Sequence, residues 1–266
     1  MKTFISCSII KSLARCLMLV FLPLYAIGDT YSDTENPYIN ALPAWKNTLS
    51  EYVDEEGRTD FIALASNIDE LKIFVDAIAE VSPKSHPDLF TSREAILSYH
   101  INAYNALAMY GVIERDIPDN FSSFFKRLSF FKLRGVTIGG KSTDLYTYEN
   151  KVIRKFDEPR LHFALNCMVR DCPRLPQEAF EPNTLDSTLD ALTREFLSKP
   201  KYIRVNHDKR TVHLSYIFKL YPEDFVESGK VKDLIPYVNR YVKPEIPSHY
   251  KVKIMDYDWT VNQQPK

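Results

Sequence analysis

Helical and strand patterns are segregated along this chain, and this segregation most strongly limits the folds that it can adopt. Between residues 45 and 116, apolar residues recur at the three- and four-residue spacing of amphipathic helices. Short strand patterns follow at residues 136–138, 202–205 and 211–214. Because no regular β-α-β alternation is present, a doubly wound sheet is disfavoured. The sequence predicts an α+β fold, with a helix-rich N-terminal half packed on a small antiparallel sheet in a single compact domain.

Three further segments complete the predicted arrangement. Residues 161–165 have the alternation of a strand and lead into a loop that contains two cysteines. Residues 231–242 have the pattern of a last amphipathic helix, and residues 250–259 that of a final strand.

The first 28 residues have the features of an export signal. Basic residues precede a short apolar run over residues 16–26, and small residues lie before a cleavage site at Asp29. The run is shorter than the roughly 20 apolar residues of a membrane span, which leaves an uncleaved anchor as the alternative. We therefore predict a signal peptide over residues 1–28, an exposed lead-in over 29–43 and a single α+β domain over 44–263. The mature protein is expected to be periplasmic or secreted, with no membrane span after cleavage.

Composition limits the classes of partner. The chain has 34 basic and 35 acidic residues, a formal net charge of −1, which argues against a dedicated nucleic-acid binder. Only 7 glycines are present, which argues against Gly-rich phosphate-binding loops. We expect a small-molecule or peptide ligand and no nucleic acid.

The residues best suited to catalysis lie between residues 157 and 175. This stretch contains Cys167 and Cys172, the two cysteines that remain once the signal is removed. A cysteine nucleophile needs a nearby base, and His162 precedes Cys167 by five residues. In an ideal strand the two side chains would point to opposite faces, so the pair meets only if the strand bends or ends early. His100 on the long predicted helix is the alternative base.

Two other interpretations of the cysteines stay open. A disulfide between Cys167 and Cys172 is expected in an oxidising compartment, and it would block Cys167 as a nucleophile or make it redox-gated. A metal site would combine His162 with both cysteines, but four-residue spacing is at the limit of known zinc motifs. We predict neither a metal nor a cofactor.

A set of short motifs is spread from Trp45 to Asn262. They are Trp45, residues 52–54 with Gly57, residues 101–106, Glu149, residues 157–160 and 162–165, Cys167 with residues 172–173, Phe196, Ser215, Tyr221 with residues 224–225, and residues 257–259 with Asn262. In these motifs the chain resembles the domain of unknown function 547 family. Two positions depart from that pattern. His100 lies where the family usually has a Trp, and Asn150 lies where a His usually follows the residue equivalent to Glu149.

The resemblance implies that His162, Cys167, Cys172, Glu149 and the pair Asn102 and Asn105 share one pocket. Our leading hypothesis is an exported thiol-dependent hydrolase or transferase that acts on an amide or peptide-like substrate. Cys167 would be the nucleophile and His162 the base, and Asn102 or Glu149 would orient them. The predicted substrate-binding side chains are Asn105, His100, Arg170 and Tyr221. The alternative is a non-catalytic periplasmic binding or scaffolding domain with a Cys167–Cys172 disulfide.

Overall fold

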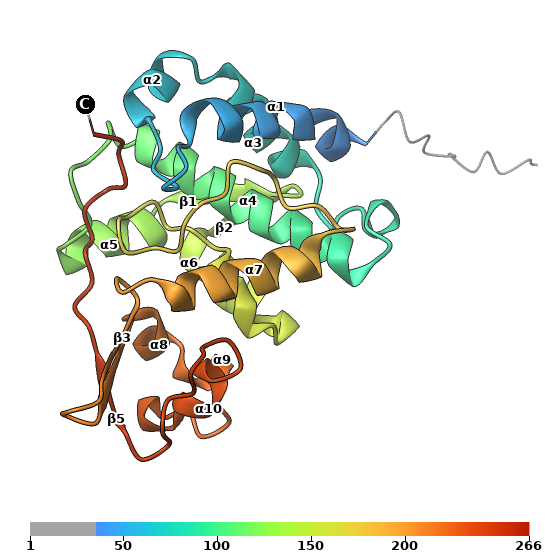
Figure 1. Cartoon of the computed structure of the whole chain (residues 1–266). Helices are drawn as coiled ribbons and strands as arrows, with labels where there is room; N and C mark the ends of the chain where they lie inside the picture. The colour runs from blue at the N-terminus through green and yellow to red at the C-terminus, as the bar shows by residue number, and fades with distance from the viewer. Residues whose placement is uncertain (1–35, 266) are drawn as a thin grey trace, which may run out of the picture.

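Helix α4, Arg93–Ile113, runs through the centre of the fold (Figure 1). The computed structural model describes residues 36–265. Every residue of α4 from Leu97 to Met109 is buried, as expected of a helix that neighbours enclose on all sides. Its first turn is capped by Ser92, whose hydroxyl accepts a hydrogen bond from the Ala95 backbone N–H at 3.0 Å.

The other helices are arranged around α4 and continue below it (Figure 1). One side is covered by α1 (Pro37–Tyr52), α2 (Phe61–Ser66) and α3 (Asp69–Glu80). The remaining helices are α5 (Phe124–Phe131), α6 (Leu145–Lys151), α7 (Leu185–Ser198), α8 (Ile217–Leu220), α9 (Pro222–Phe225) and α10 (Ile235–Val238).

Two small sheets complete the fold. Strands β1 (Gly135–Ile138) and β2 (Lys141–Asp144) form an antiparallel hairpin. In the second sheet, β3 (Ile203–Asn206) pairs with β4 (Thr211–Leu214) antiparallel, and β5 (Lys251–Ile254) pairs with β4 in parallel. The predicted α+β class is confirmed, with 48% helix and 12% strand. The strand content is divided between two sheets, one of which contains a parallel pair.

The C-terminal segment joins the two ends of the molecule, because it returns from β5 to the neighbourhood of α2 (Figure 1). The Trp259 carbonyl accepts a hydrogen bond from the Phe121 N–H at 2.8 Å, and the Met168 carbonyl accepts one from the Asn262 N–H at 3.0 Å. These bonds place Tyr257 and Trp259 beside the cysteine loop.

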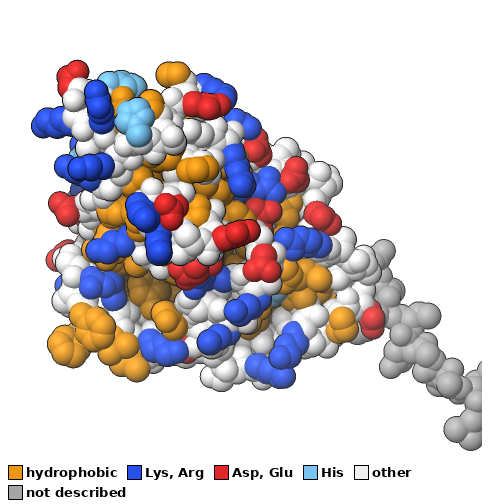
Figure 2. Space-filling view, turned by 90° about the horizontal axis from the view of Figure 1, so that it is seen from below, with side chains coloured by type: hydrophobic (Ala, Val, Ile, Leu, Met, Phe, Trp, Pro, Cys, Tyr) orange, Lys and Arg blue, Asp and Glu red, His pale blue; other side chains and the backbone are white. Residues whose placement is uncertain are grey.

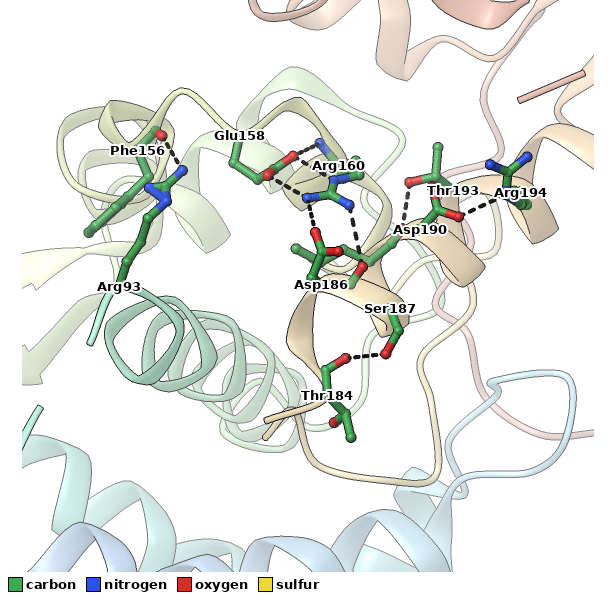
Figure 3. Close-up of polar contacts among 11 residues, drawn as sticks. Arg93, Phe156, Glu158, Arg160, Thr184, Asp186, Ser187, Asp190, Thr193 and Arg194 are labelled. Atoms are coloured by element: carbon green, nitrogen blue, oxygen red, sulfur yellow. Dashed lines mark hydrogen bonds and ion pairs between the residues drawn. The ribbon is translucent and has the colours of Figure 1, made fainter. Parts of the chain in front are cut away.

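The strand predicted over residues 161–165 is wrong, because Pro159–Phe163 is a 3-10 helix. Pro159 favours the start of a helical turn, and the Glu158 carboxylate accepts the backbone N–H of Arg160 at 3.2 Å. Arg160 also reaches Asp186 in α7 at 2.8 Å, which fixes this turn against the helix (Figure 3). The alternating apolar residues that suggested a strand belong to a turn that packs between two clusters of buried hydrophobic side chains.

Three other segments differ from expectation. The final strand predicted over residues 250–259 is limited to β5, Lys251–Ile254. Residues 37–43 belong to α1 rather than to an exposed lead-in, and Tyr38 and Ala41 are buried. The helix predicted over 231–242 is wrong; a 3-10 turn at Val231–Asp233 is followed by the separate short helix α10. Pro236 lacks a backbone N–H and is accommodated by this new helix start.

The predicted signal peptide over 1–28 and residues 29–35 of the lead-in lie outside the described residues. None of the helices within residues 36–265 combines the length and apolar content that crossing a membrane requires.

The β1–β2 turn yields a test of local packing. Gly139 and Gly140 both have positive φ, at 54° and 75°. A Cβ on Gly139 would lie 2.7 Å from the Ser82 Cβ, whereas a Cβ on Gly140 would have no atom within 4 Å. We expect Gly140→Ala to lower the free energy of unfolding by about 1 kcal/mol, the cost of a left-handed residue. Gly139→Ala should cost about 1–3 kcal/mol more, because it also overpacks the turn.

Urea unfolding of the two variants measures this difference. Equal losses of unfolding free energy would contradict the close approach of the β1–β2 turn to Ser82.

Candidate functional site

A cavity of about 580 Å³ lies between α5, α6, α8, the cysteine loop and the C-terminal segment. We call it the aromatic pocket. Its wall is mainly aromatic and aliphatic, with few polar side chains. The lining residues used below are Tyr104, Phe124, Leu128, Phe131, Tyr146, Glu149, His162, Cys167, Cys172, Leu220, Tyr221, Tyr257 and Trp259.

The two cysteines of the pocket wall are joined as a disulfide, with Cα atoms 6.3 Å apart. The Cys167 backbone N–H donates to the Cys172 Sγ at 3.1 Å, and the Tyr257 hydroxyl lies 3.5 Å from the same sulfur. Cys167 is therefore not a thiolate in this structure, because its sulfur is bonded to a second sulfur.

Buried asparagines place the cysteine loop. The Asn105 amide donates to the Ala164 carbonyl at 3.0 Å and accepts from the Asn166 N–H at 2.8 Å. Asn166 in turn donates to the Pro173 carbonyl at 2.7 Å and accepts from the Met168 N–H at 2.7 Å. Asn105 therefore holds the entry to the loop from α4 and does not line the aromatic pocket.

Glu149 carries the carboxyl group of the pocket and is held by Tyr104, whose hydroxyl donates to Glu149 Oε2 at 3.0 Å. Burial, together with the nearby Glu149 carboxyl group, raises the pKa of Tyr104 and of Tyr221 well above the ordinary value. Both hydroxyls therefore keep their protons, and that of Tyr104 donates to Glu149.

His162 is oriented by an acidic partner rather than by a cysteine. Its Nε2 lies 2.7 Å from Asp224 Oδ2, and its ring stacks on Tyr221 with centroids 4.4 Å apart. Arg154 holds the same carboxylate through both oxygens, at 2.6 and 2.7 Å. Within residues 36–265, no hydrogen bond joins His162 to Cys167.

The electrostatics of Asp224 follow from these contacts. Burial alone would raise the pKa of this carboxyl group, but the hydrogen bonds from His162 and Arg154 outweigh burial. The net effect lowers the pKa of Asp224 from 3.8 to about 2.

Four of the eight predicted site residues line the aromatic pocket: Cys167, His162, Glu149 and Tyr221. The structure brings them together although they come from different elements. The His162–Cys167 pair avoids the opposite-face geometry of a strand, because His162 lies on a 3-10 turn.

The other four predicted residues, Asn102, Asn105, His100 and Arg170, lie outside this pocket. The Asn102 side chain is 1% exposed and bonds Trp45, Tyr38 and the backbone of Phe180, so it ties α1 to the segment before α7. His100 lines a separate cavity, and its Nδ1 lies 2.7 Å from the Tyr148 hydroxyl. Arg170 lines a third pocket.

Several residues of the site were not among the predicted site residues. Asp224 bonds His162 and is itself held by Arg154, while Tyr104, Tyr257 and Trp259 complete the wall. Asp224, Tyr257 and Trp259 belong to the motifs that carry the family resemblance, which is the signal that could have found them. Asn150, one of the two departures from that family, accepts from Arg154 Nη1 at 2.6 Å and so helps to orient Arg154.

The comparisons with known proteins concern the middle of the chain. A family model described as "Protein of unknown function, DUF547" matches residues 89–197, and the chain therefore contains a DUF547 domain there. This stretch includes α4, Glu149, His162 and the disulfide, whereas Tyr221, Asp224, Tyr257 and Trp259 lie beyond it. The comparisons with curated proteins and with solved structures found no match.

The Asp224 contacts predict a pH-dependent stability difference. Because its folded pKa is lowered, Asp224 stabilises the fold above pH 3.8, and this stabilisation is lost as the pH falls through about 2. We expect Asp224→Asn to lower the free energy of unfolding at pH 7 by about 1–2 kcal/mol, a value reduced from the full shift because the carboxylate is partly solvated.

The difference between wild type and Asp224→Asn should shrink between pH 4 and pH 2, as followed by urea unfolding across that range. Asp186→Asn is the control, because its side chain is 86% exposed, and it should lose no more than about 0.5 kcal/mol. A pH-independent difference would contradict the charged interaction.

Proposed function

We propose that this domain binds a small, largely apolar or aromatic molecule in the aromatic pocket. The observation that carries this proposal is the pocket wall, in which eight aromatic side chains surround a volume of about 580 Å³. Small-molecule sites have volumes of about 300–1,000 Å³, predominantly apolar walls and a small number of placed polar groups.

Exposed apolar side chains at the edge of the pocket support the same ligand class. Phe124 is 63% exposed and lines the pocket, and the neighbouring Phe125 is 78% exposed and packs edge-on against it. Tyr146 and Leu220 are also exposed and also line the pocket. Figure 2 shows hydrophobic side chains gathered toward the left of the face seen from below, with Lys and Arg side chains around them. Contiguous exposed apolar surface of this kind favours an apolar ligand.

Glu149 indicates which polar group the ligand would carry. The Tyr104 hydroxyl donates to its carboxyl group, and its remaining acceptor capacity faces a pocket with a mainly apolar wall. A ligand with an apolar ring system and one N–H or O–H donor satisfies both features.

The probe 1-aminoanthracene tests this proposal, because it has a flat apolar body and one amine. We expect its fluorescence to rise saturably, with one molecule bound per chain. Leu128→Asp places a charge in the pocket wall and should weaken binding at least about tenfold, since burying an unpaired charge is costly.

Leu133→Asp is the matched control. Leu133 is 70% exposed and does not line the pocket, so the same substitution should leave the affinity unchanged. Equal effects of the two substitutions, or no saturable binding by the wild type, would refute the proposal.

A thiol-dependent hydrolase or transferase is the second candidate, favoured by the shared position of Cys167, His162 and Glu149 in one pocket. This activity requires an external dithiol that reduces the disulfide and is itself oxidised to a disulfide. His162 would take the proton of the freed Cys167 thiol, the thiolate would add to the carbonyl carbon of an amide, and the C–N bond would break as His162 protonates the leaving amine. Water would release the acid and restore the thiol.

Intact mass with thiol capping separates the two candidates. For the chain without residues 1–28, which contain Cys7 and Cys16, we expect without reductant a mass lower by two hydrogen atoms and no reaction with iodoacetamide, because both remaining sulfurs are bonded. If the second candidate holds, mild reduction should start amide cleavage that Cys167→Ser abolishes. Cleavage that survives in Cys167→Ser, or a reduced protein with no cleavage, would exclude a Cys167 nucleophile.

We also propose that the chain is exported and loses residues 1–28. The disulfide supports this proposal, since such bonds persist in oxidising compartments and are rare in the cytosol. The same intact-mass measurement on protein isolated from cells reads the N-terminus: Asp29 is expected, and retention of residue 1 would contradict cleavage.

A further inference from the structure

A second cavity of about 580 Å³ shares no lining residue with the aromatic pocket. It lies between α4, α6, the β1–β2 hairpin and the turn that contains Ser82 and Ser85, and we call it the His100 cavity. Its hairpin wall is fixed in place, because the N–H groups of Gly139 and Gly140 donate to the Ile78 and Ala79 carbonyls at 2.9 and 2.7 Å.

His100 is the buried polar group of this cavity. Its side chain is 6% exposed, and its Nδ1 is engaged by the Tyr148 hydroxyl at 2.7 Å. Its ring packs against Phe156, with centroids 5.5 Å apart. The other ring nitrogen, Nε2, forms no hydrogen bond with any described residue. Nε2 is also absent from the fully buried polar atoms without a partner, so protein atoms do not enclose it completely. Nε2 is therefore open to the cavity.

The proton on His100 is determined by Tyr148. Burial lowers the pKa of His100 to about 4, so the ring is neutral at pH 7. Burial also raises the pKa of Tyr148 well above the ordinary value, so its hydroxyl keeps its proton. Nδ1 is the hydrogen-bond partner of that hydroxyl among the described residues, so we assign the Tyr148 hydroxyl as the donor and Nδ1 as the acceptor. A neutral imidazole that accepts at one nitrogen carries its proton on the other. Nε2 thus presents an N–H donor to the cavity.

The charged groups around this donor are all cationic. Lys84 and Lys141 line the cavity, and neither forms an ion pair or hydrogen bond with the described residues through its side chain. Among the described residues that line the cavity, none is Asp or Glu. Ser142 and Thr143 also line the cavity, and as adjacent residues of β2 their side chains point to opposite faces of the hairpin.

Apolar side chains make up much of the remaining wall. Ile96, Ile138 and Phe156 line the cavity, and Val152, which is 39% exposed, lies at its edge. A ligand that fits must therefore have an anionic end toward the lysines and an apolar body.

We propose that the His100 cavity binds a small organic carboxylate with an apolar or aromatic skeleton. One carboxylate oxygen accepts the His100 Nε2–H, and Lys84 and Lys141 neutralise the charge. This site is separate from the aromatic pocket, and it does not depend on the proposed function.

Titration with benzoate, followed by two-dimensional ¹H–¹⁵N NMR, tests the proposal. We expect saturable shifts at the amides of residues 82–85 and 138–143. Benzyl alcohol keeps the ring but lacks the charge, and it should bind at least tenfold more weakly. Shifts confined to the aromatic pocket, or equal binding of the two probes, would overturn the proposal.

Two variants test the residues. His100→Phe should abolish the benzoate shifts, whereas His249→Phe, at an exposed position, should leave them intact. The double variant Lys84→Gln and Lys141→Gln changes only exposed side chains and should weaken benzoate at least fivefold. Lys209→Gln, on the β3–β4 turn, is its control and should have no effect. Unchanged affinity in the double lysine variant would overturn the carboxylate assignment even if His100→Phe fails to fold.

Discussion

The buried amide side chains of Asn102 and Asn105 organise this fold from the centre of α4. Each amide has its hydrogen bonds satisfied by partners far away in the sequence. Removing such an amide would leave several buried donors and acceptors without partners, which costs far more than one hydrogen bond contributes. Asn102 connects α4 to α1 and to the segment before α7, and Asn105 connects it to the start of the cysteine loop. The position of the disulfide therefore depends on a helix more than 50 residues earlier in the chain.

The aromatic pocket follows from that arrangement. With the cysteine loop held on one side, the C-terminal segment packs Tyr257 and Trp259 beside it, and α5 and α8 supply the opposing apolar side chains. The charged groups of the pocket have partners. Glu149 bonds Tyr104, His162 bonds Asp224, Lys132 pairs with Asp144, and Arg127 bonds the Phe121 and Ser122 carbonyls. The surface available to a ligand is mainly apolar, with one carboxyl group and two cationic side chains, which favours binding over thiol chemistry while the disulfide is intact.

Local patterns allowed the α+β class and the strands near residues 136–138, 202–205 and 211–214 to be predicted, because alternation acts over a few positions. They failed where a proline or a local side-chain contact outweighs the apolar pattern. Pro159 and the Glu158–Arg160 pair convert an apparent strand into a 3-10 turn. Pro236 divides a predicted helix into two pieces.

About half of the candidate site could be predicted, because sequence patterns link only residues that are close along the chain. Cys167 and His162 are close in sequence, and the disulfide was one of the alternatives that their context allowed. Asp224 is 62 residues from His162, so no spacing rule could link them. Asn102 and His100 have the residue types of a site, but only their contacts show that Asn102 is fully bonded in the core and that His100 belongs to another cavity.

The central claim is that the space between α5 and the Cys167–Cys172 disulfide is a ligand site. A crystal structure of the complex with 1-aminoanthracene tests it most directly. The account predicts density for the ring system against Trp259 and Tyr221, with the amine within hydrogen-bond distance of Glu149. Density for the probe at any other place, or a pocket closed by its own side chains in crystals that contain the probe, would contradict the account.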